Sequence, residues 1–185
     1  MAFRLLEGKN VNLRLMEKDD VNSIVGIFSN IHSEDFDPIL LMTRSEMMKR
    51  FDNPSPLESL TQNTLFVVEK KDRVKIGIAR HFVVQPLGAM EIGYIIVPSE
   101  RMKGYGTEAA QIMVDYLFLS RNIVRIQATV ETQNAASQSV LEKVGFSREG
   151  TLRRAGFMRG KWADGYLYSI LREEWKEPRI LTKTT

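Results

Sequence analysis

The sequence predicts an α/β protein with a mixed, mostly antiparallel sheet of about seven strands and helices on both faces. Runs of alternating apolar and polar residues, typical of strands, are interspersed with apolar residues at helical spacing. The predicted strands 91–97 and 125–131 are joined by a helix, which makes them parallel. The last two predicted strands are joined by a short turn at Arg159 and Gly160, which makes them antiparallel.

The N-terminal quarter is predicted to hold one strand and two helices. Residues 11–15 alternate in polarity and predict the strand. Asp19 or Asp20 is expected to cap a helix with an apolar stripe facing the core. Thr43 and Glu46 have the spacing of a capping box, which predicts the start of a second, short helix.

A meander of strands leads from these helices into the middle of the chain. Residues 64–69 and 74–84 predict two strands joined by a turn. The third strand, 91–97, ends at Pro98, because proline has no N–H for the ladder. After a glycine-containing turn, a helix is expected over 108–118.

The C-terminal part is predicted to hold one helix and two strands besides the strand 125–131. Asn134 is expected to cap the helix, and Gly145 to end it, because glycine readily adopts the left-handed conformation. Strands are expected near 150–158 and 162–172, with a β-bulge at Gly165.

Length and composition predict one ordinary domain over residues 1–175, followed by a polar, loose tail over 176–185. The net charge of +3 is too small to indicate nucleic-acid binding, although a pI of about 9.2 suits an anionic ligand. The absence of cysteine excludes disulfides, a thiolate metal site and a cysteine nucleophile, and no metal is expected. Without a signal peptide or a run of 18 apolar residues, a cytoplasmic protein with no membrane partner is expected.

The segment after the strand 91–97 is the strongest candidate for a binding site. It contains Arg101, Lys103, Gly104 and Gly106, just before a helix. Glycines let successive N–H groups converge, and the helix N-terminus adds partial positive charge. These groups predict a diphosphate site, with an ordinary turn as the alternative.

The same glycines also match a second kind of nucleotide site. Gly104, Gly106 and Ala109 fit the dinucleotide-binding fingerprint, and Glu131 ends the next strand where a ribose-binding acid belongs. That fingerprint follows its strand directly, whereas residues 98–103 intervene here. No further strand–helix units follow residue 150, so an NAD(P)-dependent oxidoreductase is the less favoured alternative.

Several motifs are spread between residues 10 and 175. They are Glu91-Ile92-Gly93-Tyr94, Arg101-x-x-Gly104-x-Gly106, Asn134-x-x-Ser137, Glu142-Lys143-Val144-Gly145-Phe146, Glu149-Gly150-x-Leu152-Arg153 and Leu171-Arg172-Glu173-Glu174-Trp175. In these motifs the chain resembles the GNAT acetyltransferases, and within them the RimJ/RimL type of protein N-acetyltransferases. The resemblance implies the GNAT (acyl-CoA N-acyltransferase) fold, acetyl-CoA as cosubstrate, and transfer of its acetyl group to a primary amine. The acceptor would be the α-amine of a protein N-terminus or a small amine, and a homodimer is expected from the subgroup.

The resemblance also implies where acetyl-CoA binds. The backbone of the basic turn would hold the pyrophosphate through Arg101, Met102, Lys103, Gly104, Tyr105, Gly106 and Thr107. The strand edge at Ile95, Ile96 and Val97 would pair with the pantetheine amides, and Asn134 and Ser137 would lie beside the cofactor. The family sheet splays between its parallel strands, so an N–H near Ile96 would polarise the acetyl carbonyl.

One position departs from the family pattern. Many members carry a tyrosine, the general acid, two residues before the lysine of Lys-x-Gly-Phe, and here that position is Leu141. In the RimL-like pattern a serine lies near the CoA sulfur instead, and Ser137 matches it; the alternative is a plain polar residue of the first helical turn. Tyr105 is the fallback proton donor. The missing tyrosine leaves a non-catalytic acyl-CoA-binding regulatory module as a further alternative.

The base and the acceptor site have candidates among the acidic residues. Glu91, on the strand beside the acetyl site, is the candidate base, with an ordinary strand glutamate as the alternative. His32 is a weaker candidate, and His81 is expected to be packing. Three acids in the loop after the first helix would suit a cationic acceptor, although a solvated loop is the more common explanation of such a cluster: Glu34, Asp35 and Asp37.

Overall fold

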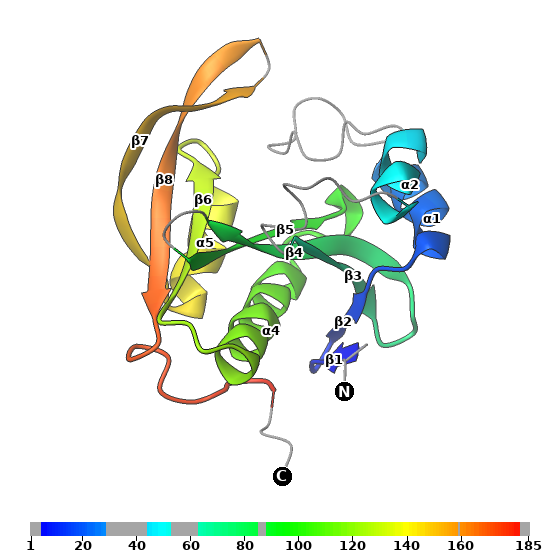
Figure 1. Cartoon of the computed structure of the whole chain (residues 1–185), viewed down its shortest axis with the longest axis horizontal. Helices are drawn as coiled ribbons and strands as arrows, with labels where there is room; N and C mark the ends of the chain where they lie inside the picture. Colours follow the sequence, from blue (N-terminus) through cyan, green and yellow to red (C-terminus); the bar gives the residue numbers. More distant parts are fainter. Residues whose placement is uncertain (1–4, 29–43, 53–62, 85–87, 159, 182–185) are drawn as a thin grey trace.

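The computed structural model describes residues 5–28, 44–52, 63–84, 88–158 and 160–181, arranged as in Figure 1. Within these residues one eight-stranded sheet has the order β1-β2-β3-β4-β5-β6-β8-β7. The strands are β1 (Leu5–Glu7), β2 (Val11–Leu15), β3 (Thr64–Lys70), β4 (Lys75–Val84), β5 (Ala89–Ile96), β6 (Arg125–Glu131), β7 (Ser147–Met158) and β8 (Lys161–Leu171). Only the β5–β6 pair of this sheet is parallel, which confirms the mixed, mostly antiparallel sheet. The short β1 is the strand that the sequence did not predict.

The helices are α1 (Val21–Phe28), α2 (Arg44–Asp52), α4 (Tyr105–Ser120) and α5 (Ala135–Val144), with short 3-10 turns η1 (Lys18–Asp20) and η3 (Pro98–Glu100). In Figure 1, α4 lies below the central strands and α2 above them. Ile112 and Leu117 of α4 are fully buried in the core beneath the sheet. Each such side chain contributes about 1.5–3 kcal/mol of burial free energy. No helix among the described residues is long and apolar enough to cross a membrane.

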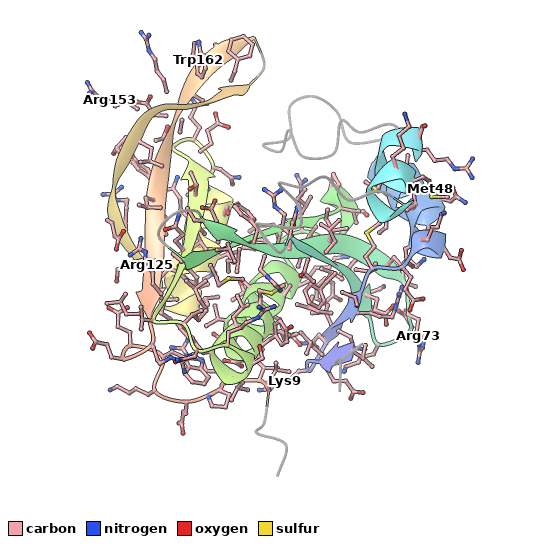
Figure 2. The ribbon with its side chains drawn as sticks, viewed as in Figure 1. Lys9, Met48, Arg73, Arg125, Arg153 and Trp162 are labelled. Atoms are coloured by element: carbon pink, nitrogen blue, oxygen red, sulfur yellow. The ribbon has the colours of Figure 1, made fainter. Side chains whose placement is uncertain are left out.

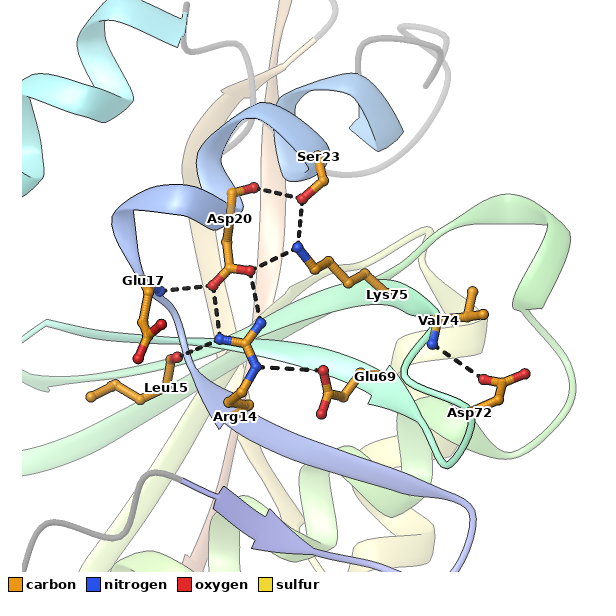
Figure 3. Close-up of polar contacts among 9 residues, drawn as sticks. All are labelled: Arg14, Leu15, Glu17, Asp20, Ser23, Glu69, Asp72, Val74 and Lys75. Atoms are coloured by element: carbon orange, nitrogen blue, oxygen red, sulfur yellow. Dashed lines mark hydrogen bonds and ion pairs between the residues drawn. The ribbon is translucent and has the colours of Figure 1, made fainter.

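A buried charge cluster fastens the start of α1 to the sheet (Figure 3). Asp20 accepts hydrogen bonds from Arg14 at 2.7 and 2.9 Å and forms an ion pair with Lys75 at 2.8 Å. Asp20 also accepts the N–H of Glu17 in the capping box of η1. The predicted cap therefore belongs to η1, the turn just before α1, and not to α1 itself. Burial alone would raise the pKa of Asp20, but the hydrogen bonds from Arg14 and Lys75 outweigh it and hold the pKa well below its usual range.

The predicted bulge lies on the other strand of the β7–β8 hairpin. The register shifts in β7 between Leu152 and Gly156, opposite Gly165, which itself stays paired with Leu152. A Cβ at Gly165 would lie 3.2 Å from Thr129 and 3.3 Å from Ala155. Gly165 therefore allows close approach of neighbouring strands and is not itself a bulge.

The first residues after Trp175 are held against α4, contrary to the expected loose tail. Asp115, with 0% exposure, accepts the Trp175 indole N–H at 2.9 Å and the Gln111 amide at 3.0 Å. It also accepts the backbone N–H groups of residues 179–181 at 2.8–3.1 Å. Because these backbone donors gain a buried charged acceptor, this segment is docked as far as residue 181.

Candidate active site

β5 and β6 separate in the middle of the sheet. Within the described residues they pair only at Met90 with Ile126 and at Glu91 with Gln127. On their outer sides, β4 stays paired with β5 as far as Ile96, and β6 stays paired with β8 to its end. Residues 92–96 of β5 therefore turn one backbone edge toward a gap in the sheet, as the resemblance implies. Such an edge can pair with the amides of an extended ligand.

The N-terminus of α4 lies at the open end of β5. The helix starts at Tyr105, earlier than predicted, and its first intrahelical bond joins the Glu108 N–H to the Gly104 carbonyl at 3.0 Å. The amides of residues 104–107 have no acceptor within the helix, because they belong to its N-cap and first turn. Gly104 has φ +84°, whereas a Cβ on Gly106 would meet only ordinary contacts at 3.7–3.9 Å. The protein itself would therefore tolerate a Cβ at Gly106, and the glycine there fits backbone binding of a diphosphate.

The charges of this turn are partly neutralised within the protein. Lys103 donates to Glu100 at 2.9 Å, and Lys70 lies 3.7 Å from the same carboxylate. The Arg101 side chain folds back and donates to the Ile96 carbonyl at 2.9 Å. Arg101 thus shapes the turn, and of the two predicted basic side chains Lys103 has a carboxylate partner. Two lysines share the Glu100 carboxylate and Arg101 adds a third positive charge, so the turn remains basic.

The N-terminus of α5 faces β5 across the gap. Asn134 caps α5 by accepting the Ser137 N–H at 3.0 Å, as predicted. The Ser137 hydroxyl lies 3.1 Å from the hydroxyl of Tyr94, which belongs to the separated part of β5. Burial raises the pKa of Tyr94 well above its usual range, and the Ser137 hydrogen bond opposes this only in part. Sequence reasoning missed Tyr94, although it ends the motif Glu91-Ile92-Gly93-Tyr94.

The two other positions considered for the acid lie elsewhere. Leu141 is 1% exposed and belongs to the core. Tyr105, in the first turn of α4, is partly buried against the same core. Among the described hydrogen bonds, the phenol that meets Ser137 belongs to Tyr94 and not to Tyr105.

Glu91 lies where β5 and β6 are still paired. The Gln127 amide donates to its carboxylate at 2.9 Å, and the Gln127 carbonyl oxygen lies 3.4 Å from the Arg125 guanidinium. Arg125 is in turn held by Glu149 at 2.5 and 2.6 Å. Because an arginine can only donate, this chain of contacts fixes the orientation of the Gln127 amide toward Glu91. Side chains alternate along a strand, so Glu91 and Tyr94 point to opposite faces of the sheet.

The remaining candidates are either buried or not described. His81 is fully buried against Phe66 and Tyr116, and burial together with the nearby Arg121 lowers its pKa to about 4, which confirms packing. The residues of the predicted acceptor loop and the capping-box start of α2 lie outside the described part: His32, Glu34, Asp35, Asp37 and Thr43.

A splayed sheet, a glycine turn at a helix start and a capped helix across the gap define a protein that binds an acyl-CoA thioester. The sequence profile of the acetyltransferase (GNAT) domain matches residues 10–147. The chain belongs to the GNAT family and is an acetyl-CoA-dependent N-acetyltransferase. Family membership decides against the NAD(P) alternative.

Similar proteins agree with this assignment. The uncharacterized N-acetyltransferase p20 of Bacillus licheniformis is 29% identical over 170 residues, covering 90% of this chain and 96% of that protein. Mycobacterium smegmatis RimJ in complex with CoA-disulfide superposes with a TM-score of 0.75 at 28% identity, over 95% of this chain and 88% of RimJ. The Vibrio cholerae spermidine N-acetyltransferase in complex with CoA and spermine has a TM-score of 0.78 at 22% identity, over 90% and 98% of the two chains. The last likeness shows the fold alone.

Proposed function

We propose that this enzyme acetylates the α-amine of a protein N-terminus. The observation that carries the proposal is the β7–β8 hairpin, an arm that extends beyond the rest of the sheet (Figure 1). The arm offers a surface that a protein acceptor can reach while its N-terminus enters the gap between β5 and β6. The likeness to RimJ, at 28% identity, supports the same class of acceptor.

The tip of the arm has the composition of an interaction surface. Phe157 and Trp162 are each 60% exposed and form an edge-to-face pair with ring centroids 5.5 Å apart. Trp162 lies at the tip and Arg153 projects outward from β7 in Figure 2, and Lys161 is also exposed. Exposed aromatic and arginine side chains are enriched in protein interfaces. The cationic side chains on the arm would repel a polyamine and attract an acidic protein surface.

The proposed mechanism uses Glu91 as the base and a backbone N–H at the gap as the oxyanion donor. Glu91 takes a proton from the ammonium acceptor, directly or through water, and the free amine attacks the acetyl carbonyl. The Val97 N–H donates to Ile76 of β4, so strand alternation turns the Ile96 N–H toward the gap. Arg101 donates a hydrogen bond to the Ile96 carbonyl and so holds this residue in place. The mechanism assigns the Ile96 N–H to the oxyanion. The amine attacks directly in this mechanism, and an acyl-cysteine intermediate is impossible because the chain has no cysteine.

The leaving group and the cofactor are assigned to the other side of the gap. The amides of residues 104–107 hold the pyrophosphate, and the open edge of β5 before Ile96 pairs with the pantetheine, because Val97 already donates to Ile76 and accepts from Glu100. The Ser137 hydroxyl donates to the CoA sulfur as the C–S bond breaks. Tyr105 lines the cofactor turn as the fallback donor.

A polyamine is the second candidate acceptor. The carboxylates of Glu34, Asp35 and Asp37 favour it, because a polyamine is cationic. Replacing all three by amides would then raise KM for spermidine, leave KM for acetyl-CoA unchanged, and have less effect at high salt.

Labelled acetyl-CoA distinguishes the two acceptors. The panel contains an acidic protein with a free N-terminus, the same protein with a blocked N-terminus, its N-terminal decapeptide and spermidine. We expect label on the free-amine protein and the peptide only. Trp162→Ala should lower kcat/KM about fivefold for the protein and leave the peptide unaffected, with Val124→Ala, another exposed apolar residue, as the matched control. Preferred turnover of spermidine, or equal labelling of the blocked protein, would refute the proposal.

A further inference from the structure

Tyr94 brings a hydroxyl to the place where this chain lacks the acid of many relatives. The position of that acid, Leu141, faces the core with 1% exposure. The Tyr94 hydroxyl comes from β5 instead and lies 3.1 Å from the Ser137 hydroxyl. The structure therefore pairs a phenol with the serine assigned to the CoA sulfur.

The surroundings of Tyr94 place it along the course of the cofactor. Its ring edge would lie 3.9 Å from a Cβ on Gly106, at the start of α4. Its hydroxyl reaches the first turn of α5 at Ser137. A ligand bound by both helix starts must pass close to this ring. Tyr94 belongs to the separated part of β5, so its position depends on the gap that admits the ligand.

Either hydroxyl can be the donor in the Tyr94–Ser137 contact, and the Tyr94 O–H also lies 3.4 Å from the Ser137 carbonyl. Each hydroxyl has one proton to donate and lone pairs to accept. The Ser137 N–H is already donated to Asn134, so the serine hydroxyl is the group free to turn. If Ser137 donates to sulfur, its oxygen accepts the Tyr94 proton, and the two hydrogen bonds strengthen each other.

We propose that Tyr94 is a positioning residue: its O–H donates to the Ser137 oxygen and thereby directs the Ser137 proton at the leaving sulfur. This inference rests on the role proposed for Ser137. As the C–S bond breaks, sulfur takes the electron pair and accepts the Ser137 hydrogen bond. The thiolate later takes a proton from solvent, and Glu91 releases to solvent the proton it took from the amine. Tyr94 keeps its own proton throughout, which agrees with its burial.

The test is Tyr94→Phe in the full-length enzyme, which keeps the ring and removes the hydroxyl. The single-turnover rate of acetyl transfer to the decapeptide, or to spermidine if only that is acetylated, should fall about threefold to tenfold. KM for acetyl-CoA should change little, because the ring beside Gly106 remains. Tyr116→Phe, which removes a phenol hydroxyl from α4 beside His81, is the matched control and should keep the wild-type rate.

A double variant separates positioning from a structural role. If Tyr94 acts through Ser137, Ser137→Ala combined with Tyr94→Phe should be no slower than Ser137→Ala alone. The thiolate ultraviolet absorbance of bound CoA gives a second readout: Tyr94→Phe should raise the pH at which the bound thiol ionises. Independent, multiplying effects of the two substitutions would overturn the inference while leaving the Ser137 assignment intact. A wild-type rate in Ser137→Ala would overturn both, whereas a different preferred acceptor would affect only the proposed function.

Discussion

The substitution Gly106→Ala should stabilise the fold and weaken acetyl-CoA binding at the same time. Gly106 is the second residue of α4, and its φ is not in the left-handed region. A Cβ there would meet Ile96 at 3.7 Å and Tyr94 at 3.9 Å, which are ordinary contacts. Neither the contacts nor the φ angle of the folded protein requires a glycine at position 106. We therefore attribute the glycine to the close approach of a bound phosphate to the backbone.

The two expected magnitudes have different origins. Alanine in place of a helical glycine stabilises by about 0.5–1 kcal/mol. For a chain of this size that corresponds to a rise in Tm of roughly 1–4 °C. The methyl group would block a phosphate from the amides, and a hydrogen bond to a charged group is worth about 1.5–3 kcal/mol. Acetyl-CoA should therefore bind roughly 10- to 150-fold more weakly.

Calorimetric titration with acetyl-CoA and thermal unfolding without ligand measure the two effects separately. Gly104→Ala is the matched control, because a Cβ there has open space but φ is +84°. It should destabilise by about 1–2 kcal/mol, since alanine is strained in that region. An unchanged acetyl-CoA Kd in Gly106→Ala would refute the pyrophosphate cradle. A loss of stability in Gly106→Ala would refute the argument that the fold has room for a Cβ at this position.

The other predictions concern chemistry and stability. Ser137→Ala should lower kcat roughly tenfold to a hundredfold in steady-state assays, with acetyl-CoA affinity little changed. Gln127→Leu should lower kcat/KM for the amine about fivefold, because Glu91 loses its hydrogen bond, while acetyl-CoA titrations stay unchanged. Asp115→Ala should destabilise by at least about 3 kcal/mol in urea unfolding, because several buried donors lose their acceptor. Asp20 should contribute stability that is complete above about pH 4 and lost as the pH falls toward its depressed folded pKa, so Asp20→Asn should flatten the acid limb of unfolding curves.

Controls and contrary outcomes keep these predictions distinct. Asp72→Ala, at an exposed carboxylate, should leave the stability near that of the wild type, unlike Asp115→Ala. A Gln127→Leu enzyme with unchanged amine kinetics would show that Glu91 is not held for catalysis. Equal acid sensitivity of Asp20→Asn and the wild type would mean that the Asp20 cluster does not govern the acid limb.

Local patterns predicted most of the fold. The β6 strand was predicted with its observed bounds, and the capping of α5 by Asn134 and its end at Gly145 were confirmed. These features depend on residues close together in the sequence, such as an N-cap side chain and the amide three residues later. The start of α4 was placed too late because its first turn contains glycine, which has low helix propensity.

Features that depend on distant residues were missed. Asp115 was not singled out in the sequence, and most of its donors come from 60 to 66 residues downstream. The bulge was assigned to Gly165, because glycine often marks one, whereas the register shift lies in the facing strand. In both cases the deciding contact joins elements whose pairing the local pattern does not specify.

The candidate site also combines features that depend on local sequence with one that depends on distant residues. Tyr94 is the latter, which explains why it was overlooked. Sequence spacing identified the glycine turn and Ser137, each of which belongs to a helix start. Tyr94 becomes a candidate only in the structure, because β5 and β6 part after Glu91. The Tyr94 hydroxyl then lies 3.1 Å from the Ser137 hydroxyl at the start of α5. The alternation of β5 points Glu91 and Tyr94 to opposite faces, so the proposed mechanism would use Glu91 for the amine and Tyr94, through Ser137, for the sulfur. If β5 and β6 were paired along their whole length, the sheet would separate these two faces. The gap between the two strands would let a single reaction involve residues from both faces.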